Sequence, residues 1–268
     1  MNRLLKPAFQ EKKKRFVPYI MSGDPTLYIS VDIAFQLQEA GADAIEWGIP
    51  FSDPLADGPV TQDAGQRSRK AGNTIMKAID AIKEARKNGL TVPIVLFTYI
   101  NPVLYFGEEA VIEKMKDADI DGLLIPDLPV EESEQIRLLC REQGISLISL
   151  ITLSSASRIE KISRQSEGFI YFVSSLGVTG TRESFSKDLA HSIEMVKDVT
   201  NVPVLIGFGV SKKEHVLYFN EISDGVIVGS ALVKQIGARA KALQSADPQE
   251  KQTALKEIKQ FVTDLISS

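Results

Sequence analysis

Short apolar runs alternate with longer amphipathic stretches along this chain. Each run is followed by a turn rich in Gly, Pro and Asp, and then by a segment whose apolar residues have helical spacing. Most runs are apolar at consecutive positions, which is typical of strands that are buried on both faces. The predicted strands are Phe16–Met21, Ala44–Trp47, Pro93–Thr98, Gly122–Ile125, Ser146–Ile151, Phe169–Val173, Val204–Ile206 and Gly225–Val228.

The spacing of these eight runs favours one fold class. Most recur at intervals of about 20 to 35 residues, the length that a strand, a loop and a returning helix need. The interval after the second run is longer, which leaves room for an extended loop. Eight parallel strands in 268 residues, with no low-complexity linker, predict an α/β protein with a single (β/α)₈ TIM-barrel domain over residues 1–268. A doubly wound open sheet is the alternative.

Both ends of the chain are expected to add helices to the barrel. Residues 1–12 can form a helix that closes the bottom of the barrel. Asp247 followed by Pro248 is typical of a helix start, with the aspartate as cap and the proline in the first turn. An apolar stripe then continues to the C-terminus at Leu255, Ile258, Phe261, Val262 and Leu265.

Composition narrows the function classes. The formal net charge of -4 argues against a nucleic-acid partner. The longest apolar runs, such as Val92–Phe97, fall far short of the roughly 18 residues that span a membrane. The single cysteine, Cys140, excludes an intrachain disulfide and favours a reducing, cytoplasmic setting. One cysteine and two distant histidines give little support to a metal site.

The second predicted strand carries an unusual charge. Glu46 lies within an apolar run, where a carboxylate is costly unless it is paired or useful. The proline-stiffened loop that follows, Phe51–Pro59, adds Asp53 and Asp57. A buried Glu46 would have a raised pKa and could exchange protons near neutral pH, whereas an exposed Asp57 would stay ionised. The alternative is that Glu46 is a structural ion-pair partner and the aspartates are turn residues.

Glycines gather after the last three strands, in Gly177–Gly180, Gly207–Gly209 and at Gly229. Barrels often bind a substrate phosphate there, because glycine lets backbone N–H groups approach an anion closely. Ser230 would cap the last barrel helix and donate its hydroxyl. The alternative is that these glycines only make tight turns. The stretch from residue 174 to 187, rich in Gly, Ser and Thr, is predicted to be a lid over the ligand.

Aromatic residues near the predicted strand ends can line a pocket for a flat substrate. They are Tyr19, Phe97, Tyr99, Tyr171 and Phe208. Trp47 alternates with Glu46, so its side chain is expected to face the helix layer as part of the core.

These motifs together resemble the tryptophan synthase alpha chain family. The signature is Ile45–Pro59, in the order Ile-Glu-Trp-Gly-Ile-Pro-Phe-Ser-Asp-Pro-Leu-Ala-Asp-Gly-Pro. Gly23–Pro25, Pro126–Glu132 and the glycine segments agree with it, so the resemblance covers nearly the whole chain. Trp47 departs from the pattern, since an aliphatic residue is expected there.

The resemblance implies a lyase that cleaves indole-3-glycerol phosphate to indole and glyceraldehyde 3-phosphate in tryptophan biosynthesis. Glu46 matches the acid/base position and Asp57 the position that stabilises the indole N–H. Tyr171 would lie near the catalytic carboxylate, and Thr179 would help to hold Asp57. The remaining family positions would flank the indole ring (Phe97, Leu124 and Phe208) or cradle the phosphate (Gly180, Gly209, Gly229 and Ser230), and Tyr19 is expected to bind substrate as one of the pocket aromatics.

The resemblance also implies an α2β2 complex with a beta chain that carries pyridoxal phosphate, while this chain needs neither metal nor organic cofactor. The expected contact surfaces are Pro50–Pro54, Asn101–Pro102 and Asp127–Pro129. Three other functions stay open: a free-standing lyase, a non-catalytic subunit that binds a phosphorylated ligand, and an isomerase or Schiff-base aldolase. The last has the least support, because no lysine is suitably placed at a strand end.

Overall fold

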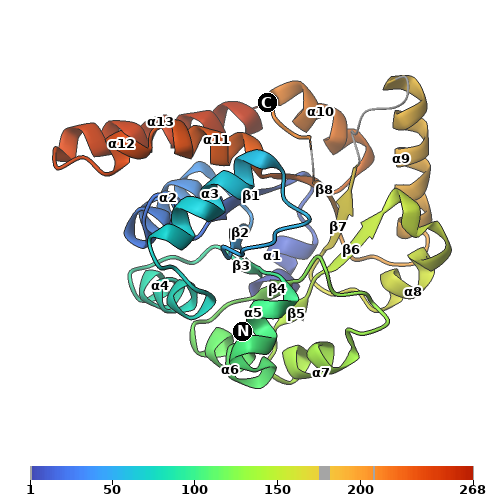
Figure 1. Ribbon diagram of the computed structural model, residues 1–268. Helices are drawn as coiled ribbons and strands as arrows, with labels where there is room; N and C mark the ends of the chain where they lie inside the picture. The colour runs from blue at the N-terminus through green and yellow to red at the C-terminus, as the bar shows by residue number, and fades with distance from the viewer. Residues whose placement is uncertain (1, 175–181, 208, 268) are drawn as a thin grey trace.

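A ring of helices surrounds a parallel sheet in the computed structural model (Figure 1). The structure describes residues 2–174, 182–207 and 209–267, and gives only the backbone for 154, 156, 157 and 182–188. The strands are β1 (Arg15–Met21), β2 (Ile45–Gly48), β3 (Ile94–Phe97), β4 (Gly122–Leu124), β5 (Ser146–Leu147), β6 (Ser149–Thr152), β7 (Ile170–Val173), β8 (Val204–Gly207) and β9 (Gly225–Val228).

The helices follow the strands in alternation. They are η1 (Arg3–Leu5), α1 (Pro7–Gln10), α2 (Leu27–Ala40), α3 (Pro59–Lys70), α4 (Ile75–Lys87), α5 (Ile100–Phe106), α6 (Glu108–Asp117), α7 (Glu134–Glu142), η2 (Leu153–Arg158), α8 (Ile159–Arg164), α9 (Arg182–Lys197), α10 (Lys213–Ile222), α11 (Ser230–Ala238), α12 (Ala240–Leu243) and α13 (Pro248–Ile266).

All eight predicted strands are present, and the predicted TIM barrel is confirmed. The strand order is β5-β4-β3-β2-β1-β9-β8-β7-β6, with every neighbouring pair parallel. The fifth predicted strand is interrupted at Ile148, so β5 pairs with β4 and β6 pairs with β7. The chain itself therefore closes the barrel between these two half-strands.

Both chain ends form helices as predicted, but the N-terminal helix is divided into two short ones. At the N-terminus, η1 and α1 replace one longer helix, and Leu4 and Phe9 are buried against the inside of the barrel. Arg15 joins this end to β1 by donating to the carbonyl of Phe9 at 2.6 Å. At the C-terminus, Asp247 caps α13 by accepting from the N–H of Gln249, and Pro248 occupies the first turn as predicted.

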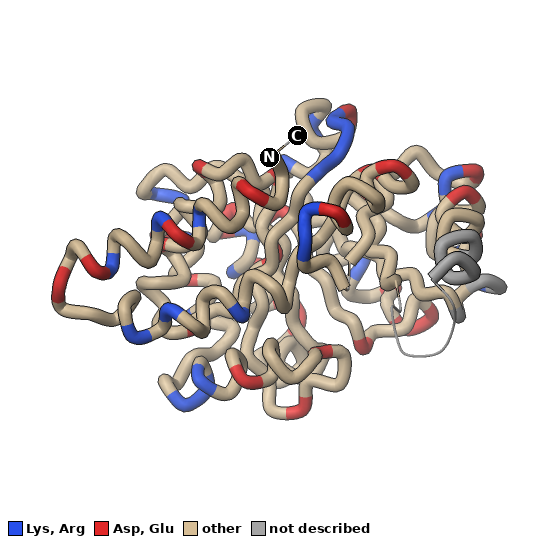
Figure 2. Tube along the Cα trace, turned by 90° about the horizontal axis from the view of Figure 1, so that it is seen from above, with Lys and Arg blue, Asp and Glu red and all other residues tan. Residues whose placement is uncertain are grey.

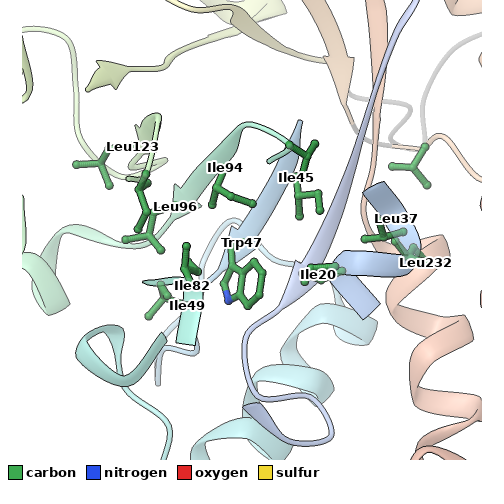
Figure 3. Close-up of a cluster of buried hydrophobic side chains, with 14 of the residues drawn as sticks. Ile20, Leu37, Ile45, Trp47, Ile49, Ile82, Ile94, Leu96, Leu123 and Leu232 are labelled. Carbon is green, nitrogen blue, oxygen red and sulfur yellow. The ribbon is translucent and has the colours of Figure 1, made fainter. Parts of the chain in front are cut away.

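The period of two along each strand separates two apolar clusters. Residues that point inward fill the barrel, including Val17, Phe97 and Leu205. Residues that point outward pack beneath the helices, and Trp47 is one of them. Its indole is fully buried among Ile20, Ile49 and Ile82 (Figure 3), which confirms that Trp47 faces the helix layer. The unusual tryptophan therefore affects packing between β2 and the helices, and it does not enter the barrel interior that Glu46 faces.

Charge is distributed over the outside of the molecule. In Figure 2, Lys and Arg are interspersed with Asp and Glu over the described helices and loops. None of the described helices is both long and apolar enough to cross a membrane.

Candidate active site

Glu46 points into the barrel from β2. Its Cα pairs with Tyr19 of β1, and its outward-facing neighbour is Trp47. The residue is only 1% exposed, and its Oε1 atom has no hydrogen-bond partner among the described residues. Burial raises the pKa of Glu46 to about 8, because the low-dielectric interior disfavours the charged form. Glu46 is therefore mostly protonated at neutral pH, and the described residues offer it no ion-pair partner.

Asp57 reaches the same place from the long loop after β2. The Ala56 N–H donates to the Tyr99 hydroxyl at 2.9 Å, and the Gln62 side chain donates to the Asp57 carbonyl at 2.8 Å. Phe51, earlier in this loop, stacks on Tyr99 with ring centroids 5.1 Å apart. Partial burial raises the pKa of Asp57 to about 6, so its carboxyl is mainly ionised above that pH.

The two carboxyl groups line one cavity of about 130 Å³ at the carboxyl ends of the strands. This is the end at which (β/α)₈ barrels carry their active sites. Eight of the predicted site residues meet here, from both halves of the sequence. The full lining is Tyr19, Glu46, Ala56, Asp57, Gly58, Thr61, Phe97, Tyr171, Gly209, Val210, Ile227, Gly229 and Ser230.

Two tyrosines flank the carboxyl groups, and each depends on a glycine in the next strand. A Cβ at Gly48 would lie 2.0 Å from the Tyr19 hydroxyl oxygen, and one at Gly207 would lie 2.2 Å from that of Tyr171. The registers match, since Met21 pairs with Gly48 and Val173 with Gly207, two residues beyond each tyrosine. Both glycines are therefore needed for space at the cavity.

Burial, together with the negative charges of Glu46 and Asp57, raises the pKa of both tyrosines well above the usual value. Their hydroxyls stay protonated across the physiological range and keep a proton to donate. Tyr19 also packs edge-on against Phe97, with ring centroids 5.6 Å apart. The cavity thus combines an aromatic wall with polar groups at fixed places.

One end of the cavity is suited to an anion. Gly229, Ser230 and Gly209 line it, and the N-terminus of α11 opens into it. The first N–H groups of a helix have no partner inside the helix, and they favour negative charge. Ser230 is the first residue of α11 rather than its cap, and Gly229 holds the cap position without a side-chain bond. The predicted capping by Ser230 is therefore wrong, and its hydroxyl is not used at the helix end.

Several residues that are predicted to belong to the site do not line this cavity, or lie outside the residues that the structure describes. Leu124 is fully buried inside the barrel and is not among the residues that line the cavity. Tyr99 supports the Asp57 loop instead of lining the pocket. Thr179, Gly180 and Phe208 lie outside the described residues, as do residues 175–181 of the predicted lid at 174–187.

The sequence reasoning missed five lining residues: Ala56, Gly58, Thr61, Val210 and Ile227. The signal for Thr61 is present in the sequence, because Gly58-Pro59 is typical of a helix start next to Asp57. A helix that starts at the cavity presents its first turn to it, and Thr61 lies in that turn.

Comparison with known proteins identifies the family. The family model described as "Tryptophan synthase alpha chain" matches residues 5–263. The chain belongs to the tryptophan synthase alpha chain family. The protein of that name from Halalkalibacterium halodurans is 46% identical over 264 residues, covering 98% of this chain and 99% of the relative. The one from Bacillus subtilis (strain 168) is 46% identical over 258 residues, covering 96% of each.

Solved structures of relatives have the same fold. A chain of the tryptophan synthase a2b2 complex from Pyrococcus furiosus superposes with a TM-score of 0.84 at 35% identity, covering 96% of this chain and 99% of that one. Tryptophan synthase subunit alpha from Legionella pneumophila gives a TM-score of 0.83 at 31% identity, covering 98% of each chain. The resemblance noted in the sequence therefore extends through the whole barrel.

The buried Glu46 predicts a pH-dependent loss of stability. Its pKa is about 8 when folded and about 4.3 in an unfolded chain. Between these values the folded state keeps a proton that the unfolded chain releases, so the free energy of unfolding falls as pH rises. Glu46→Gln removes this effect. We therefore compare the free energy of unfolding of Glu46→Gln with that of the natural chain, as measured by urea unfolding. The difference, variant minus natural chain, should become more positive by roughly 2 to 4 kcal/mol between pH 5 and pH 8.

Glu113→Gln is the matched control, because Glu113 is an exposed residue on α6. Its stability should follow that of the natural chain across the same pH range. If the free energies of unfolding of Glu46→Gln and Glu113→Gln change in parallel with pH, folding does not raise the pKa of Glu46, and the prediction is wrong.

Proposed function

We propose that this chain cleaves indole-3-glycerol phosphate to indole and glyceraldehyde 3-phosphate, with Glu46 as general acid and base and Asp57 as the stabiliser of the indole N–H. The observation that carries the proposal is the pairing in one cavity of a buried, protonated carboxyl group with a partly buried, ionised one. Two carboxyl groups whose environments separate their pKa values can divide acid and base roles.

Glu46 has the protonation state that the first step needs. In that step its carboxyl gives a proton to C3 of the indole ring, and positive charge develops at the ring nitrogen. The resulting carboxylate then takes the proton of the glycerol hydroxyl next to the ring. The bond between C3 and the glycerol carbon breaks, its electrons return to the ring, and the aldehyde forms. Glu46 ends protonated again, so the cycle balances with proton transfers alone.

Asp57 supplies the negative charge that this step needs. With a pKa of about 6, it is ionised at the pH where Glu46 is still protonated. A carboxylate that accepts the ring N–H stabilises the cation as it forms, and low local dielectric strengthens the effect. The bonds that hold Ala56 and the Asp57 carbonyl keep the loop in place before the substrate arrives.

The substrate's two ends match the two ends of the cavity. Tyr19, Phe97 and Tyr171 form an aromatic wall suited to the indole ring. The start of α11 with Gly229 and Ser230 suits the phosphate. Thr179, Gly180 and Phe208 are expected to contribute by family analogy, whereas Leu124 lies in the barrel interior outside the cavity lining.

Release of glyceraldehyde 3-phosphate from indole-3-glycerol phosphate tests the proposal. Glu46→Gln should lower kcat by about 100- to 10,000-fold while substrate affinity is retained, because general acid–base catalysis is lost. Asp57→Asn should lower kcat by about 100- to 1,000-fold, because the transition-state charge loses its partner. Asp53→Asn, an exposed position in the same loop, is the matched control and should keep near-normal turnover.

Near-normal turnover in Glu46→Gln would remove its acid/base role. Loss of release from the natural, folded chain, with and without a beta chain, would contradict the lyase function itself. Fast release by the isolated chain would indicate a free-standing lyase.

We also propose that this chain works in the cytoplasm within an α2β2 complex, and that pyridoxal phosphate belongs to the partner beta chain. The matched Pyrococcus furiosus chain comes from such a complex. A largely apolar groove of about 690 Å³ is suited to docking a partner chain. Its lining includes Pro50, Asn101 and Pro102, which are among the predicted contact residues. Leu104 and Tyr105 line this groove while 54% and 82% exposed. Exposed apolar residues grouped in this way are typical of protein interfaces.

The groove is connected to the cavity through packed rings. Phe51 lines the groove and stacks on Tyr99, which packs edge-on against Phe97 at the cavity, with centroids 6.5 Å apart. Since Tyr99 also accepts the Ala56 N–H, a partner that contacts Phe51 in the groove would be only one ring away from the residue that supports the Asp57 loop.

Leu104→Asp tests this surface. The charge should weaken binding of a tryptophan synthase beta chain by about 10-fold or more, while turnover of the isolated chain stays within about two-fold. Leu138→Asp on α7 is the control, because Leu138 has a similar exposure of 51% and does not line the groove. Equal beta-chain affinity for the two variants, measured by calorimetry, would place the interface elsewhere.

A further inference from the structure

Thr61 presents a hydroxyl group that the proposed mechanism does not use. The residue is 7% exposed and lines the cavity together with Asp57, Gly209 and Ser230. Its hydroxyl has no hydrogen bond to any described residue, although the residue as a whole is more than nine-tenths buried. The hydroxyl oxygen is not among the fully buried unpaired atoms, so it remains accessible from the cavity. A hydroxyl that is accessible from a ligand cavity and unbonded to the described protein groups is available to donate a hydrogen bond to a ligand.

The local structure leaves this hydroxyl available. A helical threonine commonly bonds to the carbonyl four residues earlier, which is that of Asp57. Here the Gln62 side chain donates to that carbonyl at 2.8 Å, whereas Thr61 uses only its backbone N–H, which donates to Gly58 at 3.0 Å. The threonine side chain is thus directed to the cavity by the start of α3.

The surroundings of Thr61 favour an anionic ligand. Thr61 lies in the first turn of α3, where the helix dipole is positive, and α3 packs against α11. Both helices begin at a glycine, Gly58 and Gly229, without a side-chain cap. The lining contains neither lysine nor arginine among its described residues. Apart from the two tyrosines beside the carboxyl groups, two helix starts and the hydroxyls of Thr61 and Ser230 are therefore the groups among the described lining residues that favour an anion.

We propose that Thr61 is a further substrate-binding residue, whose hydroxyl donates a hydrogen bond to a phosphate oxygen of the substrate. This proposal rests on the proposed function, and it extends the phosphate site from the end of the barrel to the helix that follows Asp57. The phosphate would then contact the same short segment that holds Asp57. Correct binding of the phosphate would thereby help to fix the position of the catalytic loop.

Thr61→Val is the direct test, because valine keeps the shape and removes the hydroxyl. Isothermal titration should show binding of glycerol 3-phosphate and of inorganic phosphate weakened by about 10-fold, since hydrogen bonds to charged groups are among the stronger ones. Binding of indole should be unchanged. In the cleavage assay KM should rise by a similar factor with kcat changed less than about three-fold. Thr61→Ser should restore phosphate binding.

Thr263→Val on α13 is the matched control, because that hydroxyl bonds only to the Lys259 carbonyl of its own helix. It should leave all three affinities unaltered. Unchanged phosphate affinity in Thr61→Val, or an equal loss for indole, would overturn the proposal and leave Thr61 as a packing residue. Both outcomes are separate from the proposed function, which fails only if the natural chain does not cleave the substrate.

Discussion

The site depends on the desolvation of one carboxyl group. Glu46 lies in the apolar interior of the barrel, with 1% of its surface exposed and one oxygen without a hydrogen-bond partner among the described residues. In such surroundings the charged form is disfavoured, which raises the pKa of Glu46 to about 8. The fold tolerates this destabilising group because the parallel strands β1 to β9 surround it with a large apolar core. Stability is therefore reduced at the residue that we propose exchanges a proton with the substrate.

The alternation of side chains along β2 determines how this group is supported. Glu46 faces inward and Trp47 outward, so the bulky indole fills the layer beneath the helices without entering the cavity. Gly48 then leaves space for Tyr19, as Gly207 does for Tyr171 on the far side of the barrel. Tyr99 fixes the loop that brings Asp57 to the same cavity. The two carboxyl groups consequently lie in different environments, one fully buried and one partly solvated.

Much of this arrangement could be predicted from the sequence, because it follows from local pattern. Apolar runs at regular intervals indicate the barrel, and a charge within one of them marks Glu46. The interruption at Ile148 could not be predicted, because it depends on the pairing of β5 and β6 with different neighbours. The bracing role of Tyr99 and the free hydroxyl of Thr61 depend on contacts between distant segments. Ser230 was expected to cap a helix, but the cap position falls one residue earlier.

The most direct test of the central claim is the titration of Glu46 itself. The carboxyl signal that disappears in Glu46→Gln can be followed in the folded chain by infrared difference spectroscopy or by ¹³C NMR of labelled glutamate. Desolvation by the barrel predicts that this carboxyl group titrates at a pKa of about 8 and is mainly protonated at pH 7. A pKa near the ordinary value of about 4.3 would show an ionised Glu46 at neutral pH and would contradict the account.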